Sequence, residues 1–115
     1  MKTLFITAMA SAIAFSAGAA EVNKTYTRKG DQEIRVFTVD GKLYCRRSSD
    51  NFEMCNGMTA TGDAGTYAGA KMKHPDMPQF MTFDGTAVIG TNQKFSIKGC
   101  VLGGGVCDSE IWDEQ

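Results

Sequence analysis

The chain has 115 residues, of which 43% are hydrophobic, and its 12 basic and 13 acidic side chains give a formal net charge of -1 at pH 7. A chain of this length has room for one domain with a single modest core. The balanced charge gives no electrostatic footprint of a protein that binds nucleic acids or anionic membranes.

The first twenty residues have the pattern of a secretory signal peptide. Lys2 precedes an apolar run from Leu4 to Phe15, and the small residues at 17–20 provide a cleavage site. The apolar run is shorter than the roughly 18 to 20 residues of a membrane-spanning helix. We therefore predict a signal peptide at residues 1–20. Residues 21–115 are predicted to be a single small domain, periplasmic or secreted, without stable membrane insertion after cleavage.

The first predicted hairpin turns at Asp40-Gly41, a dipeptide that favours a type I′ turn because both central residues need a positive φ. Pairing across this turn places Val36 opposite Cys45 and puts Cys45 on the core face. Two aromatic and two basic side chains share the other face, which we predict to be a possible interaction face: Arg35, Phe37, Tyr44 and Arg46.

The middle of the chain is predicted to contain a strand, a turn and a second hairpin. Residues 66–73 alternate in the manner of a strand, and residues 74–78 contain two prolines, which cannot donate to a strand ladder. A second Asp-Gly pair, Asp84-Gly85, predicts a hairpin in which Phe80 faces Ile89.

The C-terminal segment is predicted to form a hairpin that turns at Gly103-Gly104. Equal spacing from this turn sets Cys100 opposite Cys107 and Phe95 opposite Trp112. Directly opposed strand residues have Cα atoms about 4.5 to 5.5 Å apart, within the range that a disulfide accepts. The two aromatic side chains then share the core face.

The four cysteines indicate disulfides, because an exported chain folds in an oxidising compartment. Four cysteines allow three pairings, and we predict Cys45–Cys55 and Cys100–Cys107, since each pair is close in sequence and separated by turn residues. A redox pair usually has two intervening residues, and a structural zinc site has closely paired ligands. Neither spacing occurs here, so disulfides are favoured.

Alternation with a period of two, broken by glycine turns, dominates the chain after residue 20, and no window shows a helical stripe. This pattern predicts an all-β fold, in which an antiparallel meander of seven or eight strands curls toward a barrel and is stapled by disulfides.

The segment GCVLGGGVCDSEIW, residues 99–112, resembles the C-terminal signature of an exported bacterial family known as domain of unknown function 2147. Residues 66–73, TYAGAKMK, are similar to the strand just upstream in that family. Cys45 and Cys55 resemble a second cysteine pair of some members. The resemblance implies a small lipocalin-like antiparallel barrel and implies no catalytic residue.

Catalytic chemistry has little support in the sequence. The only histidine, His74, precedes a proline in a predicted turn, which disfavours a nucleophile–base pair. Glycosidases use paired carboxylates, but the acidic residues near the C terminus are predicted to form a solvated face. These acidic residues are Asp108, Glu110, Asp113 and Glu114. We therefore predict no enzyme, no catalytic residue and no cofactor.

A methionine-rich segment offers an alternative metal site. Its four candidate ligands lie within ten residues: Met72, His74, Met77 and Met81. Thioether and imidazole groups select Cu(I), whereas methionine also fills irregular gaps in protein cores. We predict that the methionines belong to the core and retain a Cu(I) site as the alternative.

Three functional hypotheses follow. The leading one is a non-enzymatic binding or interaction domain of the bacterial cell envelope, which takes either a small apolar ligand in the barrel mouth or an envelope protein on an outer face. The first alternative is a periplasmic Cu(I) carrier. The second is an inhibitor or accessory protein of cell-wall enzymes, suggested by size, export and disulfides.

Overall fold

The computed structural model describes residues 20–115, so the predicted signal peptide, apart from Ala20, lies outside the described residues. The described chain is all-β, as predicted, with a single 3-10 turn, η2 (Leu102–Gly104), and no α-helix in residues 20–115. No helix in this range is long and apolar enough to cross a membrane. The strands are β2 (Asn23–Arg28), β3 (Gln32–Val39), β4 (Lys42–Arg47), β5 (Phe52–Glu53), β6 (Met58–Ala60), β7 (Thr66–Met72), β8 (Phe83–Ile89), β9 (Lys94–Val101) and β10 (Val106–Glu114).

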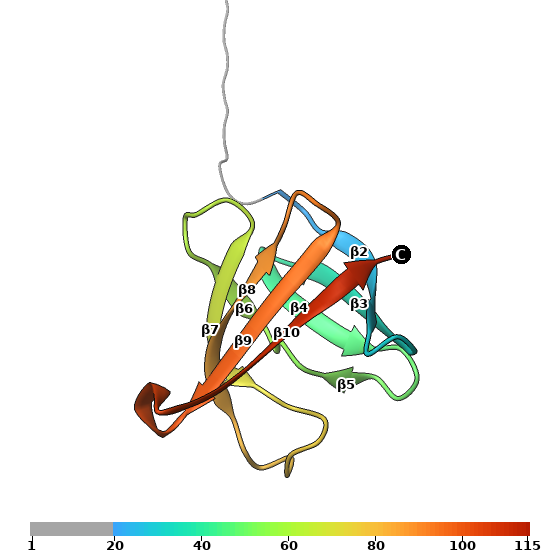
Figure 1. The fold of residues 1–115 in the computed structure, drawn as a ribbon. Helices are drawn as coiled ribbons and strands as arrows, with labels where there is room; N and C mark the ends of the chain where they lie inside the picture. Colours follow the sequence, from blue (N-terminus) through green and yellow to red (C-terminus); the bar gives the residue numbers. More distant parts are fainter. Residues whose placement is uncertain (1–19) are drawn as a thin grey trace, which may run out of the picture.

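The strands form one antiparallel sheet that closes into a barrel (Figure 1). The order is β3-β2-β10-β9-β8-β7-β6-β4, and the pairing of β3 with β4 completes the ring. The short strand β5 pairs with the C-terminal end of β4. The pairing of β2 with β10 joins the two ends of the described chain. This closure confirms the predicted barrel and leaves few exposed strand edges.

The first hairpin has the predicted register. Val36 pairs with Cys45 and Thr38 pairs with Leu43. Asp40-Gly41 makes the turn with φ angles of 53° and 79°, both positive as a type I′ turn requires. The turn preference of Asp40-Gly41 therefore fixes the register of the hairpin, and with it which side chains of both strands point into the core.

The predicted hairpin at Asp84-Gly85 is wrong. Both residues lie inside β8, where Gly85 pairs with Gly69 on one side and with Gly99 on the other. A Cβ atom on Gly85 would lie 1.8 Å from the carbonyl oxygen of Lys98. Glycine is needed here for the close approach of two strands, not for a turn.

The predicted pairing of Phe80 with Ile89 is also wrong, because Phe80 precedes β8. It lies in the loop at 73–82 and is 85% exposed. Ile89 pairs instead with Phe95 on β9. The strand predicted at 66–73 is confirmed as β7, and the proline segment that follows is a loop.

The C-terminal hairpin agrees with the prediction residue by residue. Cys100 pairs with Cys107 and Phe95 pairs with Trp112, and the two aromatic rings stack with centroids 4.9 Å apart. Both predicted disulfides are present: Cys45–Cys55 and Cys100–Cys107. Gly103 and the residues around it form the turn η2.

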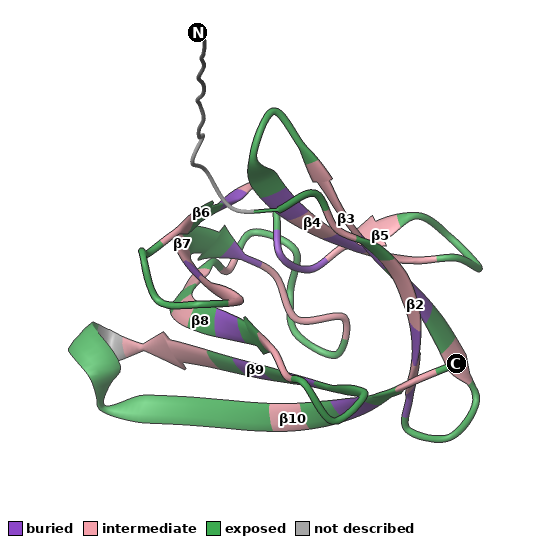
Figure 2. Ribbon diagram, turned by 90° about the horizontal axis from the view of Figure 1, so that it is seen from above, coloured by how far each residue is buried: buried purple, intermediate pink, exposed green. Residues whose placement is uncertain are grey.

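Core side chains fill the inside of the barrel. Buried and exposed positions alternate along the strands, as expected when one face of a sheet packs inward (Figure 2). The largest buried apolar side chains are Trp112, Tyr26, Tyr67, Phe95, Ile34, Leu43, Met58 and Val36. Among the described residues, Arg28 is the one buried charged side chain.

Candidate functional site

The four residues of the predicted interaction face meet on the outside of β3 and β4. Ile34 and Val36 on β3 point into the core, so the residues between and after them point outward. Arg35 pairs with Arg46, and Phe37 pairs with Tyr44. We call these four residues the aromatic–arginine face: Arg35, Phe37, Tyr44 and Arg46.

Stacking holds this face together. The rings of Phe37 and Tyr44 stack with centroids 5.7 Å apart and an interplanar angle of 20°. The guanidinium carbon of Arg35 lies 5.0 Å from the Phe37 centroid. That of Arg46 lies 5.1 Å from the Phe37 centroid and 5.6 Å from that of Tyr44. These distances fall within the range of cation–π attraction.

The face keeps a positive charge. Arg46 donates to Glu53 at 2.7 Å, and the other carboxylate oxygen of Glu53 accepts the backbone N–H groups of Cys45 and Asn56. Arg35 is exposed and forms no ion pair with a residue in the described range. Like charges that lie directly opposite each other on paired strands destabilise a sheet. The opposition of Arg35 and Arg46 therefore costs stability, which the ion pair of Arg46 with Glu53 and the cation–π contacts partly offset.

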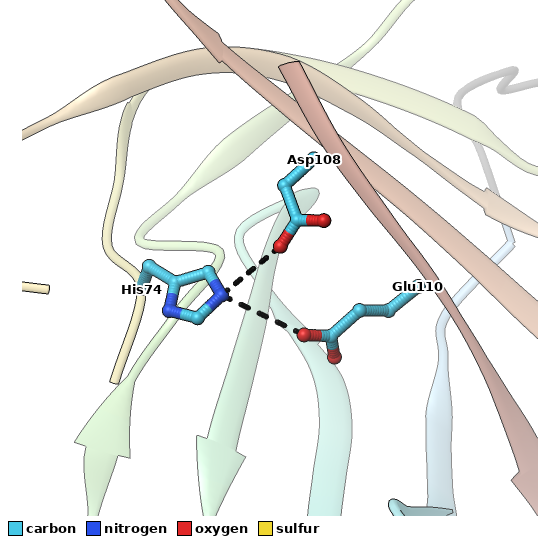
Figure 3. A group of neighbouring side chains, drawn as sticks. All are labelled: His74, Asp108 and Glu110. Atoms are coloured by element: carbon cyan, nitrogen blue, oxygen red, sulfur yellow. Dashed lines mark hydrogen bonds and ion pairs between the residues drawn. The ribbon is translucent and has the colours of Figure 1, made fainter. Parts of the chain in front are cut away.

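A second group of polar side chains lies at the end of the barrel where residues 73–82 connect β7 to β8 (Figure 3). His74 Nε2 lies 3.2 Å from Asp108 Oδ2 and 3.7 Å from Glu110 Oε2. Both carboxylates come from β10, where residues two positions apart share a face. Beside them is an apolar pocket of about 40 Å³. Its apolar lining consists of Met54, Met72, Phe83, Ile97 and Trp112.

Glu110 corrects the prediction that the C-terminal acidic residues form a solvated face. The side chain of Asp108 is 65% exposed, but that of Glu110 is only 20% exposed. Arg28 holds it in place, with Nε 2.6 Å from Oε1 and Nη2 2.8 Å from Oε2, and Trp112 Nε1 donates to Oε1 at 2.8 Å. Glu110 lies two residues before the core residue Trp112 on the same strand. Because alternate residues of a strand share a face, the inward direction of the Glu110 side chain could have been predicted from the sequence.

The electrostatics of this pair follow from its contacts. Burial by itself would raise the pKa of Glu110, but hydrogen bonds from Arg28 and Trp112, and the charge of Arg28, lower it below the ordinary value. The hydrogen bond to Glu110 is the main cause that raises the pKa of Arg28. Both groups are therefore charged at neutral pH.

The group of His74, Asp108 and Glu110 has the donors of a metal site, and their ligand atoms lie within 4.8 Å of one another. Zinc bonds of about 2.0 to 2.1 Å place tetrahedral ligand atoms about 3.3 Å apart, which is close to the 3.2 Å and 3.7 Å that separate His74 Nε2 from the two carboxylates.

The hydrogen bonds around the group do not suit a metal. His74 Nδ1 accepts the backbone N–H of Asp76 at 3.0 Å, which puts the proton of a neutral ring on Nε2, the atom that faces the carboxylates. A metal-bound histidine normally donates from its second ring nitrogen, which is the opposite arrangement. Glu110 is also already engaged by Arg28. The geometry is that of a hydrogen-bonded ion cluster.

The structure brings together only part of the alternative Cu(I) set. Met72 is buried and lines the same pocket as His74. Met77 is 45% exposed, so the prediction that it belongs to the core is wrong. Met81 is partly buried and lies in the loop at 73–82, and neither it nor Met77 lines the pocket.

The chain matches no model of a known protein family, and no curated protein or solved structure shows significant similarity to it. The resemblance of residues 99–112 to domain of unknown function 2147 stays a prediction. The geometry of the surfaces described above is therefore the evidence on what the protein binds.

Proposed function

We propose that the protein is an exported, non-enzymatic interaction domain of the bacterial cell envelope, and that it binds a partner protein through the aromatic–arginine face. The observation that carries this proposal is the direct opposition of Arg35 and Arg46 over the stacked rings of Phe37 and Tyr44. The two disulfides fit an oxidising compartment, which supports export.

The chemistry of the face favours carboxylates on the partner. Arginine and aromatic residues are enriched in the energetically dominant parts of protein interfaces. Because guanidinium groups lie over the rings of Phe37 and Tyr44, a sugar ring would find these faces occupied, whereas a carboxylate can bind a guanidinium in a bidentate manner. A partner carboxylate would also relieve the repulsion between Arg35 and Arg46.

The two ends of the barrel differ in the room they offer to the small apolar ligand of the other hypothesis. The pocket beside His74 measures about 40 Å³, whereas sites for small organic ligands usually occupy about 300 to 1,000 Å³. The hollow beside the 61–65 loop measures about 520 Å³ and is large enough for such a ligand. The aromatic–arginine face is therefore preferred for its opposed arginines and stacked rings, not for its volume. No observation favours the proposal of an inhibitor of cell-wall enzymes over other protein partners.

The test compares three immobilised mature chains in envelope extract: the natural sequence, Arg35→Gln/Arg46→Gln, and Lys94→Gln/Lys98→Gln. The last variant removes the same charge from exposed positions on β9 and serves as the control. Captured proteins are identified by mass spectrometry, and the purified partner is measured by calorimetry. We expect the dissociation constant to rise at least about tenfold, equivalent to about 1.4 kcal/mol, in the arginine variant and to stay unchanged in the control. Equal binding by all three chains would refute the proposal.

A further inference from the structure

We propose that the groove next to the aromatic–arginine face holds an extended acidic segment of the partner protein. This inference rests on the proposed function, because Tyr44 belongs to both surfaces. The groove measures about 440 Å³ and lies over β4, β6 and β7. Its lining residues are Lys42, Tyr44, Asn56, Gly57, Thr59, Ala68, Gly69, Ala70 and Lys71.

The groove lies where the sheet is interrupted. β6 is only three residues long and pairs with β7 at two positions, Thr59 with Ala68 and Ala60 with Tyr67. Farther along β7, the register with β8 shifts, so that Ala70 and Lys71 have no partner residue in either ladder.

The chain before β6 lies along this part of β7: the backbone N–H of Lys73 donates to the carbonyl oxygen of Met54 at 3.0 Å. The amide of Asn56 donates to the carbonyl oxygen of Lys71 at 3.0 Å. These contacts leave no open strand edge beside Lys71. The groove therefore offers the outer face of the sheet, where the side chains of a bound segment make the contacts.

The small side chains of the groove let a peptide backbone approach closely. Ala68, Gly69 and Ala70 present no bulk on this part of β7. At Gly57, φ is +80°, and a Cβ atom would lie 3.4 Å from the hydroxyl oxygen of Tyr44. Glycine at this position permits the backbone conformation, while a Cβ atom would be in ordinary contact with Tyr44.

Charge complementarity identifies the occupant as acidic. The lining contains two cations, Lys42 and Lys71, and no carboxylate. Both lysines are exposed, and neither forms an ion pair with any residue in the described part of the chain. With Arg35 and Arg46 on the adjoining face, the surface presents four cations, against which Glu53 is the one carboxylate in contact. Alternating acidic side chains of an extended segment would meet these cations on one face.

The experiment uses a fluorescein-labelled peptide of alternating glutamate and threonine, titrated with the mature protein and followed by fluorescence anisotropy. A matched peptide of alternating glutamine and threonine is the control for charge. We expect the control peptide to bind at least about tenfold more weakly than the acidic peptide. Failure of the acidic peptide to bind, or equal binding of the two peptides, would overturn the inference.

Two double variants separate this inference from the proposed function. We expect Lys42→Gln/Lys71→Gln to weaken both the peptide and the purified partner, while Lys94→Gln/Lys98→Gln weakens neither. If the Lys42 and Lys71 variant binds both normally and Arg35→Gln/Arg46→Gln does not, the groove inference fails and the proposed function stands. The reverse result would refute the aromatic–arginine face and retain the groove. Tighter binding of a short single-stranded oligonucleotide than of the acidic peptide would overturn the choice of a protein partner.

Discussion

Arg28 on β2 and Glu110 on β10 form a two-point ion pair inside one end of the barrel, with N–O distances of 2.6 Å and 2.8 Å. The Arg28 side chain is 1% exposed, and its other polar contacts are Gln32 on β3 at 2.8 Å and the exposed Asp76 at 3.7 Å. The pair therefore links the strand that begins the barrel to the strand that closes it.

This pair predicts strong coupling between two positions far apart in the sequence. Glu110→Leu leaves Arg28 buried without its carboxylate, and we expect it to lower the free energy of unfolding by about 3 kcal/mol. Arg28→Met/Glu110→Leu removes both charges and should lose much less than the sum of the single changes. Urea unfolding of the two single variants and the double variant measures the coupling. Additive losses would show that the two side chains do not act as a pair.

Acid should weaken the same pair. The pKa of Glu110 in the folded chain lies below its ordinary value of 4.5, so the unfolded chain binds more protons and stability falls as the pH drops through this range. In Glu110→Gln, the decline of unfolding free energy from about pH 5 to about pH 3 should be shallower than in the natural chain. Asp50→Asn is the comparison at the surface, since Asp50 is exposed and a hydrogen bond from the partly buried Arg47 lowers its pKa. An unchanged slope in Glu110→Gln would contradict this account.

The two disulfides should contribute unequally. Loop closure predicts about 2.5 kcal/mol for Cys100–Cys107 and about 2.8 kcal/mol for Cys45–Cys55, given separations of 7 and 10 residues. Cys45 and Cys55 are also buried, whereas Cys107 is exposed. Replacing both members of the buried pair with alanine should therefore lower unfolding free energy more than Cys100→Ser/Cys107→Ser, because it also leaves a cavity. Chemical denaturation compares the two variants, and a larger loss from the exposed pair would refute the ranking.

Removing the hydroxyl group of Tyr26 should not lower stability, unlike the changes above. Its hydroxyl is buried without a hydrogen-bond partner among the described residues, and burial, followed by the charge of Glu114, raises its pKa to about 12. Removing an unsatisfied polar atom while the ring is kept should be neutral or stabilising. We expect Tyr26→Phe to keep or raise the thermal midpoint. A loss of more than about 2 kcal/mol would show that the hydroxyl is satisfied in solution.

Local patterns predicted most of the fold. Counting outward from Gly103-Gly104 placed Cys100 opposite Cys107, because a short hairpin fixes its own register. The turn predicted at Asp84-Gly85 is wrong because the dipeptide has the same turn preference wherever it occurs, whereas here it lies inside β8. Only the neighbouring strands show that Gly85 is required for close packing.

The sequence predicts a candidate site only where its residues are close together in the chain. Phe37 and Tyr44 belong to one hairpin, so alternation alone was enough to place them together. The contact of His74 with Asp108 joins a loop to a strand 34 positions away, and no local pattern indicates it. The groove lies over three strands, β4, β6 and β7, so no single local pattern indicates it.

The central claim is that partners bind on the aromatic–arginine face, and NMR chemical-shift mapping tests it most directly. The isotope-labelled mature chain is titrated with the acidic peptide and then with the purified partner. We predict that the amides of Arg35, Phe37, Tyr44 and Arg46 shift, together with those of residues 68–71. Shifts confined to residues 73–82 and β10 would place binding at the barrel end near His74 and contradict the account.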